Sequence, residues 1–198
     1  MADDILKVAE EAGIDVNESL PVEIPTGNLP GEFAQGYNDD ANANYLLRLF
    51  GINLFYVKAW GWCCWNGKQW QKGSEENAVK YAKIAGRNLY LEAAKQKDLE
   101  HAKQLGKHAN NTLSNHRISA MLELAKSEVT KSVSDFDQDK YLLNCQNGVL
   151  SLLDGVLIPH DRKHMLTKMA GVSYDKEADC PLFKRFLGEV VPDGEIRK

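Results

Sequence analysis

The 198-residue sequence lacks the features of a membrane protein or a disulfide-bonded secreted protein. No run approaches the roughly 18 consecutive apolar residues that a bilayer-spanning helix needs. The first residues, MADDILKVAEE, are acidic, whereas a secretory signal begins with a basic region followed by an apolar one. The four cysteines are too few for a disulfide scaffold and have no C-x-x-C spacing. These absences predict a cytoplasmic protein with reduced thiols and no membrane contact.

The sequence also lacks the short motifs of common nucleotide-binding and hydrolytic sites. A P-loop requires G-x-x-x-x-G-K-[ST], because the glycine-rich backbone cradles the phosphates and the Ser or Thr holds magnesium. The Gly-Lys pairs at 67–68 and 106–107 are followed by Gln69 and His108, so neither qualifies. No G-x-S-x-G, H-E-x-x-H or G-x-G-x-x-G motif occurs. No cofactor site is therefore expected within these residues.

Charge is distributed unevenly along the chain. Residues 1–50 contain 2 Lys or Arg against 10 Asp or Glu, a balance of −8. Residues 51–131 contain 13 against 7, a balance of +6, and residues 132–198 contain 9 against 11, a balance of −2. A polyanion would therefore bind the middle segment, and the binding would weaken with salt. The alternative is that these lysines only cover the solvated faces of helices.

All four tryptophans lie in FYVKAWGWCCWNGKQWQKG, residues 55–73, which predicts a β-hairpin. Asn66-Gly67 is typical of a two-residue turn, in which Trp65 would pair with Lys68. Strand alternation then gives one face with Cys63, Trp65, Lys68 and Trp70, and another with Trp60, Trp62, Cys64, Gln69 and Gln71. The two adjacent cysteines point apart, so a shared metal is not expected. The tryptophans are expected to pack in the core; the alternative is a platform on which single-stranded bases stack beside Lys68.

The remaining pattern predicts a mainly helical α+β fold. A helix over residues 3–12 precedes an aperiodic stretch with prolines and glycines, so residues 1–37 are predicted to be a flexible N-terminal segment and 38–198 the compact domain. A helix over residues 41–50 would be capped by Asn38, Asp39 or Asp40.

Two or three further helices are expected over residues 75–131. The first would begin after Ser74, whose side chain would cap it, and a break is expected near Gly106 or at NNTLSN. The turn pairs Asn147-Gly148 and Asp154-Gly155 predict a second small antiparallel sheet in the C-terminal third. A last helix is expected after Pro181, with Phe183, Phe186 and Leu187 on its apolar side.

Two groups of side chains offer metal ligands. In SDFDQDKY, alternation would place Asp135, Asp137 and Asp139 on one side of an extended segment, as in two-metal phosphoryl chemistry. This leaves open a metal-dependent nucleic-acid enzyme that uses Asp135 and Asp137, although solvated acids before a strand are commoner. His160 and His164 stand four residues apart and would share a face only in a helix, so ordinary surface histidines are favoured.

Several short motifs also follow one another in a particular order. They are W-x-x-x-x-W-N-G-x-x-W at 60–70, F-D at 136–137, L-L-N-x-x-N-G-V at 142–149, P-H-x-R at 159–162, T-K at 167–168, Y-D at 174–175, A-D-C-P-x-F at 178–183, and F-L through P-D at 186–193. Over residues 41–198 this order resembles the region before the helicase domain in the phage and plasmid primase-helicase family. That region is shared with the poxvirus nucleoside triphosphatase-primase.

The resemblance implies a non-catalytic, helicase-preceding linker or collar domain, cut off before the ATPase domain of a larger DNA replication protein. The parent would be a hexameric superfamily 3 helicase that uses ATP and magnesium in a bacterial host cell. Its partners would be single-stranded or forked DNA and further copies of the chain. Within the positive middle segment, Lys68, Lys80, Lys83 and Arg87 are the candidate DNA-binding residues. A freestanding protein-interaction module remains an alternative.

Overall fold

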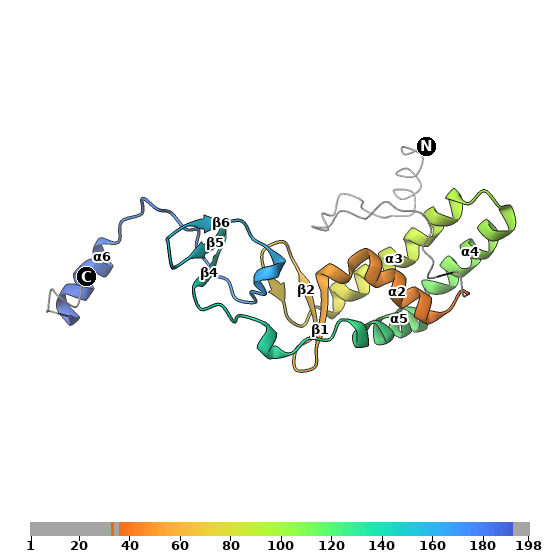
Figure 1. Cartoon of the computed structure of the whole chain (residues 1–198), viewed down its shortest axis with the longest axis horizontal. Helices are drawn as coiled ribbons and strands as arrows, with labels where there is room; N and C mark the ends of the chain where they lie inside the picture. The colour runs from red at the N-terminus through yellow and green to blue at the C-terminus, as the bar shows by residue number, and fades with distance from the viewer. Residues whose placement is uncertain (1–32, 34–35, 192–198) are drawn as a thin grey trace.

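A computed structural model describes residue 33 and residues 36–191 of the chain. It is elongated, with a helical part, two small sheets and a last helix following one another along the long axis (Figure 1). The described elements are α2 (Asp39–Phe50), η2 (Gly51–Asn53), β1 (Leu54–Val57), β2 (Gly61–Trp65), β3 (Trp70–Gln71), α3 (Glu75–Lys95), α4 (Leu99–Thr112), α5 (Asn115–Glu128), η3 (Val133–Asp135), β4 (Leu142–Cys145), β5 (Gly148–Ser151), β6 (Leu157–Ile158), η4 (Arg162–His164) and α6 (Pro181–Val190). The predicted α+β fold is confirmed.

Helix α2 begins two residues before the predicted start. The Asn38 side chain accepts a hydrogen bond from Ala41 N at 2.8 Å, so Asn38 is the N-cap. Asp39 and Asp40 occupy the first turn, where negative charge is favourable to the helix dipole. Gly51 follows α2 in a right-handed helical conformation, at φ −58°, rather than in the left-handed one that often ends a helix. The chain therefore continues directly into η2.

Three helices occupy the region predicted to hold two or three. The break between α4 and α5 falls at Leu113 and Ser114, inside NNTLSN, whereas Gly106 lies within α4. The predicted side-chain cap of α3 is wrong. Ser74 Oγ donates to Gln71 O at 2.8 Å and makes no cap hydrogen bond, because the preceding strand places that carbonyl within its reach.

The Trp-rich hairpin forms, but its predicted pairing is wrong. Trp65 pairs with Trp70 rather than with Lys68, so four residues make the turn. The Asn66 side chain explains the difference, since its Oδ1 accepts from the backbone N–H of both Lys68 and Gln69 at 2.9 Å. A shift of two residues preserves strand alternation, and Cys63 and Cys64 still point to opposite faces.

Each face of the first sheet covers its own cluster of buried side chains. Trp62 and Cys64 face the larger cluster, formed mostly by the helices. Cys63, Trp65 and Trp70 face a smaller cluster that includes Val57 and Phe136. Three residues depart from the predicted faces: Lys68 and Gln69 lie in the turn between β2 and β3, and Trp60 lies in the turn before β2. The ring of Trp60 packs on Phe136, with centroids 5.3 Å apart. Core packing of the tryptophans is confirmed: Trp62, Trp65 and Trp70 are at most 6% exposed.

The second predicted sheet is confirmed as an antiparallel β4-β5-β6 meander. Gly148 begins β5 at φ 155°, and a Cβ there would lie 2.6 Å from Ile158 O, so only glycine fits this crossing. The sheet is joined to the Trp-rich hairpin by side chains. Asn144 Nδ2 donates to Lys68 O at 3.0 Å, and Lys68 Nζ donates to Gln146 O at 2.8 Å.

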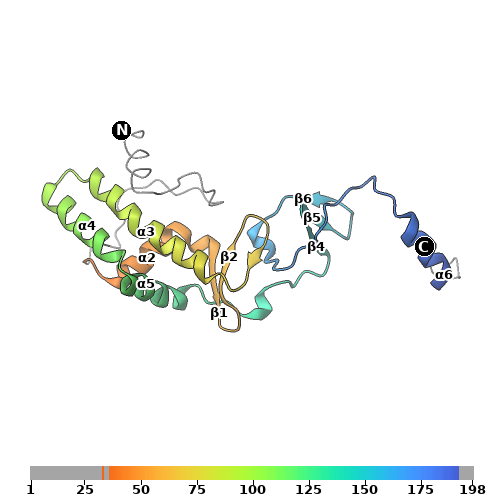
Figure 2. The ribbon, with the colours of Figure 1, turned by 180° about the vertical axis from the view of Figure 1, so that it is seen from behind.

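Helix α6 begins at Pro181 as predicted and lies at the opposite end of the molecule from α4 (Figures 1 and 2). Its apolar side is not buried: the exposed side chains are Leu182 at 72%, Phe183 at 56%, Phe186 at 53% and Val190 at 59%. The segment that connects the second sheet to α6 contains no helix or strand over residues 171–180 (Figure 1). Helix α6 therefore presents an apolar face that the described part of the chain leaves open.

Only part of the segment predicted to be flexible is described. Phe33 is 5% exposed, with its ring centroid 5.5 Å from that of Tyr45 and 5.6 Å from that of His108. Tyr37 also packs on His108, at 5.1 Å. The helix predicted over residues 3–12 lies outside the described residues.

His108 lies in a buried polar cluster between α2 and α4. Its Nε2 is 2.7 Å from Asn42 Oδ1 and 3.3 Å from Thr112 Oγ1. Burial lowers the pKa of His108 below its ordinary value of 6.5. The nearby Arg117 lowers this pKa further, and Asp39 partly offsets both effects. At pH 7 the folded chain therefore holds His108 as the neutral imidazole.

The free energy of unfolding is expected to fall as the pH drops below about 6.5, because the unfolded chain then binds a proton that His108 in the fold does not. Above that pH both states hold a neutral imidazole, and His108 adds no pH dependence. Urea unfolding at pH 7.5 and 5.5 tests this. His108→Gln should lose less stability on acidification than the wild type, whereas the exposed control His116→Gln should match the wild type. Equal acid sensitivity of His108→Gln and wild type would contradict the prediction.

Candidate nucleic-acid interface

Three of the four predicted DNA-binding residues form one surface on α3. Lys80, Lys83 and Arg87 are spaced i, i+3 and i+7, which places them on one side of a helix. All three are exposed, while Ala78, Tyr81, Ala82, Ala85 and Leu89 of the same helix are buried. The ion pairs in the described part of the chain involve other residues. We name Lys80, Lys83 and Arg87 the α3 basic face.

Helix α4 extends this surface with two lysines that the sequence analysis missed. Tyr90 OH donates to Asn110 Oδ1 at 3.2 Å, which joins the exposed sides of α3 and α4. Lys103 and Lys107 lie on the same side of α4 as Asn110, at spacings of seven and three residues, and both are exposed. The signal was present as a lysine pair four residues apart, but only helix pairing shows that it adjoins α3.

Lys68 lies apart from the α3 basic face. It belongs to the turn between β2 and β3, and its Nζ donates to Gln146 O at 2.8 Å. Its backbone carbonyl accepts from Asn144 Nδ2. Lys68 therefore connects the two sheets, and the structure does not bring it together with the other three candidates.

The tryptophans do not form the alternative stacking platform. Three of them are almost fully buried, and Trp60 is half-buried with Lys72 Nζ 3.9 Å from its ring centroid. Base stacking requires an accessible ring face. The aromatic side chains of the hairpin therefore act as core residues.

The three predicted acidic ligands each accept hydrogen bonds from a different residue. Asp135 Oδ2 accepts from Ser132 N at 2.8 Å within a capping box. Asp137 Oδ1 and Oδ2 accept from Thr167 N at 2.8 Å and Thr167 Oγ1 at 2.5 Å. Asp139 Oδ1 accepts from Tyr141 N at 2.9 Å. The predicted alternation fails because η3 and the left-handed Asp137, at φ 53°, turn the backbone between the acids.

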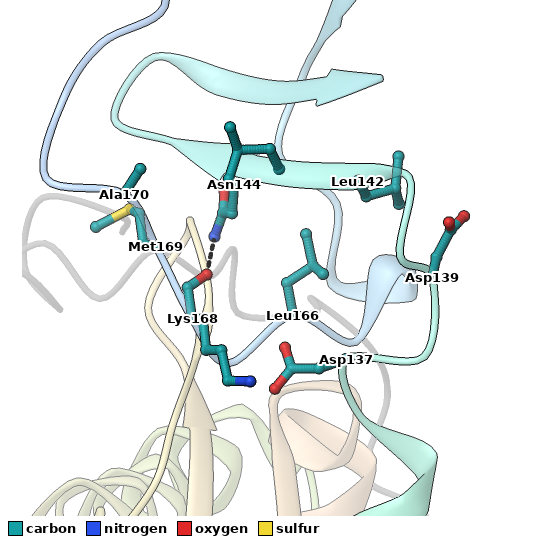
Figure 3. Close-up of a pocket in the computed structure, with 9 residues that line it drawn as sticks. Asp137, Asp139, Leu142, Asn144, Leu166, Lys168, Met169 and Ala170 are labelled. Carbon is teal, nitrogen blue, oxygen red and sulfur yellow. Dashed lines mark hydrogen bonds between the residues drawn. The ribbon is translucent and has the colours of Figure 1, made fainter. Parts of the chain in front are cut away.

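Asp137 and Asp139 do line one pocket, of about 350 Å³, together with Leu142, Leu143, Asn144, Leu166, Lys168, Met169 and Ala170. Figure 3 shows the Asp137 carboxylate turned toward Leu166 and Lys168, while that of Asp139 points away from it. Asn144 Nδ2 donates across the pocket to Lys168 O at 3.1 Å (Figure 3). In the described part of the chain, no three His, Cys, Asp or Glu side chains gather as metal ligands. The pocket is thus a junction between segments that are far apart in sequence.

The histidine pair does not form a helical metal site. Only Arg162–His164 is helical, as the short η4, and His160 precedes it. His160 Nε2 lies 3.5 Å from Gln146 O. His160 and His164 do not lie in one helix, so they do not share a helical face.

Cys63 and Cys64 of the hairpin are buried thiols with low reactivity. Burial raises the pKa of Cys63 to about 11 and that of Cys64 to about 12. Cys145 is also buried, and Cys180 is exposed. Among the described residues, no helix is long and apolar enough to cross a membrane.

The class of protein follows from this α+β architecture and from the sequence comparison taken together. The chain matches the family described as D5 N terminal like over residues 43–192, which is most of its length. It therefore belongs to that family, the domain that precedes the superfamily 3 helicase in phage and poxvirus primase-helicase proteins. The predicted resemblance is confirmed. No curated protein matches the chain at a significant level.

Proposed function

We propose that this region engages single-stranded or forked DNA for a parent replication helicase-primase. The observation that carries the proposal is the α3 basic face, where three exposed cations share one side of a helix without paired carboxylates in the described chain. Lys103 and Lys107 add positive charge on the adjoining helix. Phosphate contacts of this kind give affinity without sequence preference, which suits a protein that moves along DNA.

We propose that the region contributes binding rather than catalysis, and that ATP and magnesium act in another part of the parent. The acids that could have held metals do not gather at one site in the described chain, and they accept hydrogen bonds from Ser132, Thr167 and Tyr141 instead. This favours the binding function over the metal-dependent enzyme considered as an alternative.

The triple variant Lys80→Gln, Lys83→Gln, Arg87→Gln is expected to bind a single-stranded oligonucleotide more weakly than the wild type. Each phosphate contact contributes about 0.7 to the slope of log K against log salt for single strands, so the slope should fall by about 2. Fluorescence anisotropy with a labelled strand at rising salt measures both quantities.

A matched control removes the same charge from elsewhere on the surface, with Lys131→Gln, Lys140→Gln, Lys176→Gln, all at exposed positions. Its salt slope should remain within about 0.5 of the wild-type value. Equal weakening by both triple variants would show that net charge alone governs binding and would contradict an interface on α3. Absence of saturable, salt-sensitive binding by the chain and its parent would remove the DNA part of the proposal.

We further propose that the chain assembles with copies of itself and that α6 lies in the contact. The support is the apolar side of α6, with Leu182, Phe183, Phe186 and Val190 exposed, since contiguous apolar side chains of this kind mark interaction surfaces. Lys184 and Arg185 lie between them and keep the rest of the helix polar.

Sedimentation velocity should detect concentration-dependent oligomers of the parent protein. The double variant Phe183→Ser, Phe186→Ser should shift the distribution toward the monomer by removing two aromatic contacts, while Lys184→Ser, which changes a polar position of the same helix, should not. An unchanged distribution for the phenylalanine variant would place the contact elsewhere and would contradict the role of α6.

A further inference from the structure

A second pocket lies where the segment after β6 crosses the end of the Trp-rich hairpin. It has a volume of about 490 Å³ and is lined by Ile52, Trp65, His160, Asp161, Arg162 and Lys163. It differs from the pocket lined by Asp137 and Asp139, because three of its six lining residues have basic side chains: His160, Arg162 and Lys163. We name it the His160–Lys163 pocket.

Arg162 is held in place by contacts at both ends of the residue. Its Nη1 donates to Asn53 Oδ1 at 2.8 Å, and its backbone carbonyl accepts from Trp70 Nε1 at 3.0 Å. Asn53 is fully buried, so this anchor is fixed by the core. A guanidinium has five N–H donors, and no carboxylate in the described chain forms an ion pair with this one. Arg162 is therefore a positioned cation with donors to spare.

Two buried nitrogen atoms beside Arg162 lack partners. Asn53 Nδ2 and His160 Nδ1 are both shielded from solvent and have no hydrogen-bond partner in the described chain. Buried polar atoms are rarely left unpaired, because they lose their hydration without gaining a partner. Of these two residues, His160 lines the pocket, whereas Asn53 supports it from the core through its hydrogen bond with Arg162. The unpartnered imidazole nitrogen is therefore the atom that a ligand bound in the pocket would satisfy.

Asp161, the acidic residue that lines the pocket, already accepts a hydrogen bond. Asp161 Oδ1 accepts from Lys163 N at 2.9 Å, where it caps η4. Lys163 is exposed. Lys68 Nζ donates to Gln146 O, and His160 Nε2 lies 3.5 Å from the same oxygen. The sequence candidate Lys68 thus lies beside this pocket rather than beside the α3 basic face.

We infer that the His160–Lys163 pocket binds a phosphate group, with Arg162 and Lys163 as its cationic ligands. Planar guanidinium donors match the oxygens of a phosphate. Ile52, 64% exposed, and the edge of Trp65 provide an apolar wall against which the attached sugar or base can pack. The phosphate belongs to a nucleic-acid backbone or to a free nucleotide, and the inference depends on the proposed function only in the choice between these sources.

Nuclear magnetic resonance titrations of the chain with inorganic phosphate, thymidine monophosphate and an oligothymidylate test the inference. The Trp65 indole signal and the amide signals of residues 160–163 are expected to shift in a saturable manner with at least one of the three. Saturation at the lowest concentration by the oligothymidylate would assign the phosphate to a backbone. Saturation by the mononucleotide, with no effect of the strand, would assign it to a free nucleotide.

Two variants separate charge from geometry. Lys163→Gln changes an exposed side chain and should weaken phosphate binding about 1.5- to 5-fold, the range for loss of one solvent-exposed ion pair. Arg162→Lys retains the positive charge but loses the planar guanidinium and its paired N–H donors, so it should also weaken phosphate binding. The urea midpoint of this variant shows whether it still folds. Lys140→Gln, on another exposed position, should bind as the wild type does.

The inference fails if none of the three compounds shifts the pocket signals at millimolar concentration, or if Lys163→Gln binds like the wild type. Its failure is distinguishable from failure of the proposed function. Strand-dependent shifts on α3 alone would support the α3 basic face and overturn the pocket. Shifts at the pocket alone would do the reverse.

Discussion

Trp70→Ala is expected to lower the free energy of unfolding by about 3 to 5 kcal/mol, the range for removal of a fully buried aromatic side chain. Trp70 is 1% exposed, and its ring stacks on Phe55 with centroids 4.4 Å apart. Its Nε1–H bonds to Arg162 O, so the side chain also connects the hairpin to a segment about ninety residues further along the chain. Both the packing and the connection would be lost.

Urea unfolding followed by circular dichroism measures this loss. Trp70→Phe keeps an aromatic ring and removes the indole hydrogen bond, so it should cost less than Trp70→Ala, and Trp60→Ala should also cost less because Trp60 is only half-buried. A Trp70→Ala protein of wild-type stability that had lost DNA affinity would contradict the core role and would revive the stacking hypothesis.

Asp137→Ala is expected to lower the free energy of unfolding by about 3 kcal/mol, because hydrogen bonds to a charged group contribute about 1.5 to 3 kcal/mol each and are only partly independent. Both carboxylate oxygens accept from Thr167, which holds the chain before β4 against the segment after η4. The residue also has φ 53°, a conformation that aspartate tolerates better than alanine.

Thermal or urea unfolding again provides the measurement, with Asp139→Ala as the matched control. Asp139 is exposed and accepts from Tyr141 N, so solvent screens this hydrogen bond and its loss should cost about 1 kcal/mol or less. An Asp137→Ala protein of unchanged stability would contradict the structural role. Manganese-stimulated nicking by the wild type that vanished in Asp137→Asn would favour the metal-dependent alternative instead.

The largest effects on stability and on binding are thus expected from different parts of the molecule. Trp70 and Asp137 connect segments and are held by the fold, whereas Lys80, Lys83 and Arg87 contribute little to packing because they are exposed. Substitutions on α3 can therefore test DNA binding without unfolding the chain. Substitutions of the tryptophans cannot, since loss of structure would accompany any loss of affinity.

The sequence by itself determined the local elements and the family. Helical spacing predicted α2, the helices between residues 75 and 131, and α6, because an amphipathic pattern and a capping residue act within one or two turns. The turn pairs at Asn147-Gly148 and Asp154-Gly155 predicted the second sheet for the same reason. The order of short motifs gave the family, and the spacing of Lys80, Lys83 and Arg87 gave one helical face.

Tertiary structure decided the features that depend on contacts between distant residues. The Asn66 side chain, not the turn dipeptide alone, set the pairing of Trp65 with Trp70. Asp137 meets Thr167 across 30 residues, and Lys68 meets Gln146 across 78. Such contacts form only when packing of the core brings the segments together, and their donors and acceptors then satisfy one another according to distance rather than spacing. For that reason the sequence placed Lys68 among the DNA-binding lysines, whereas the fold places it beside a pocket that no local pattern predicts.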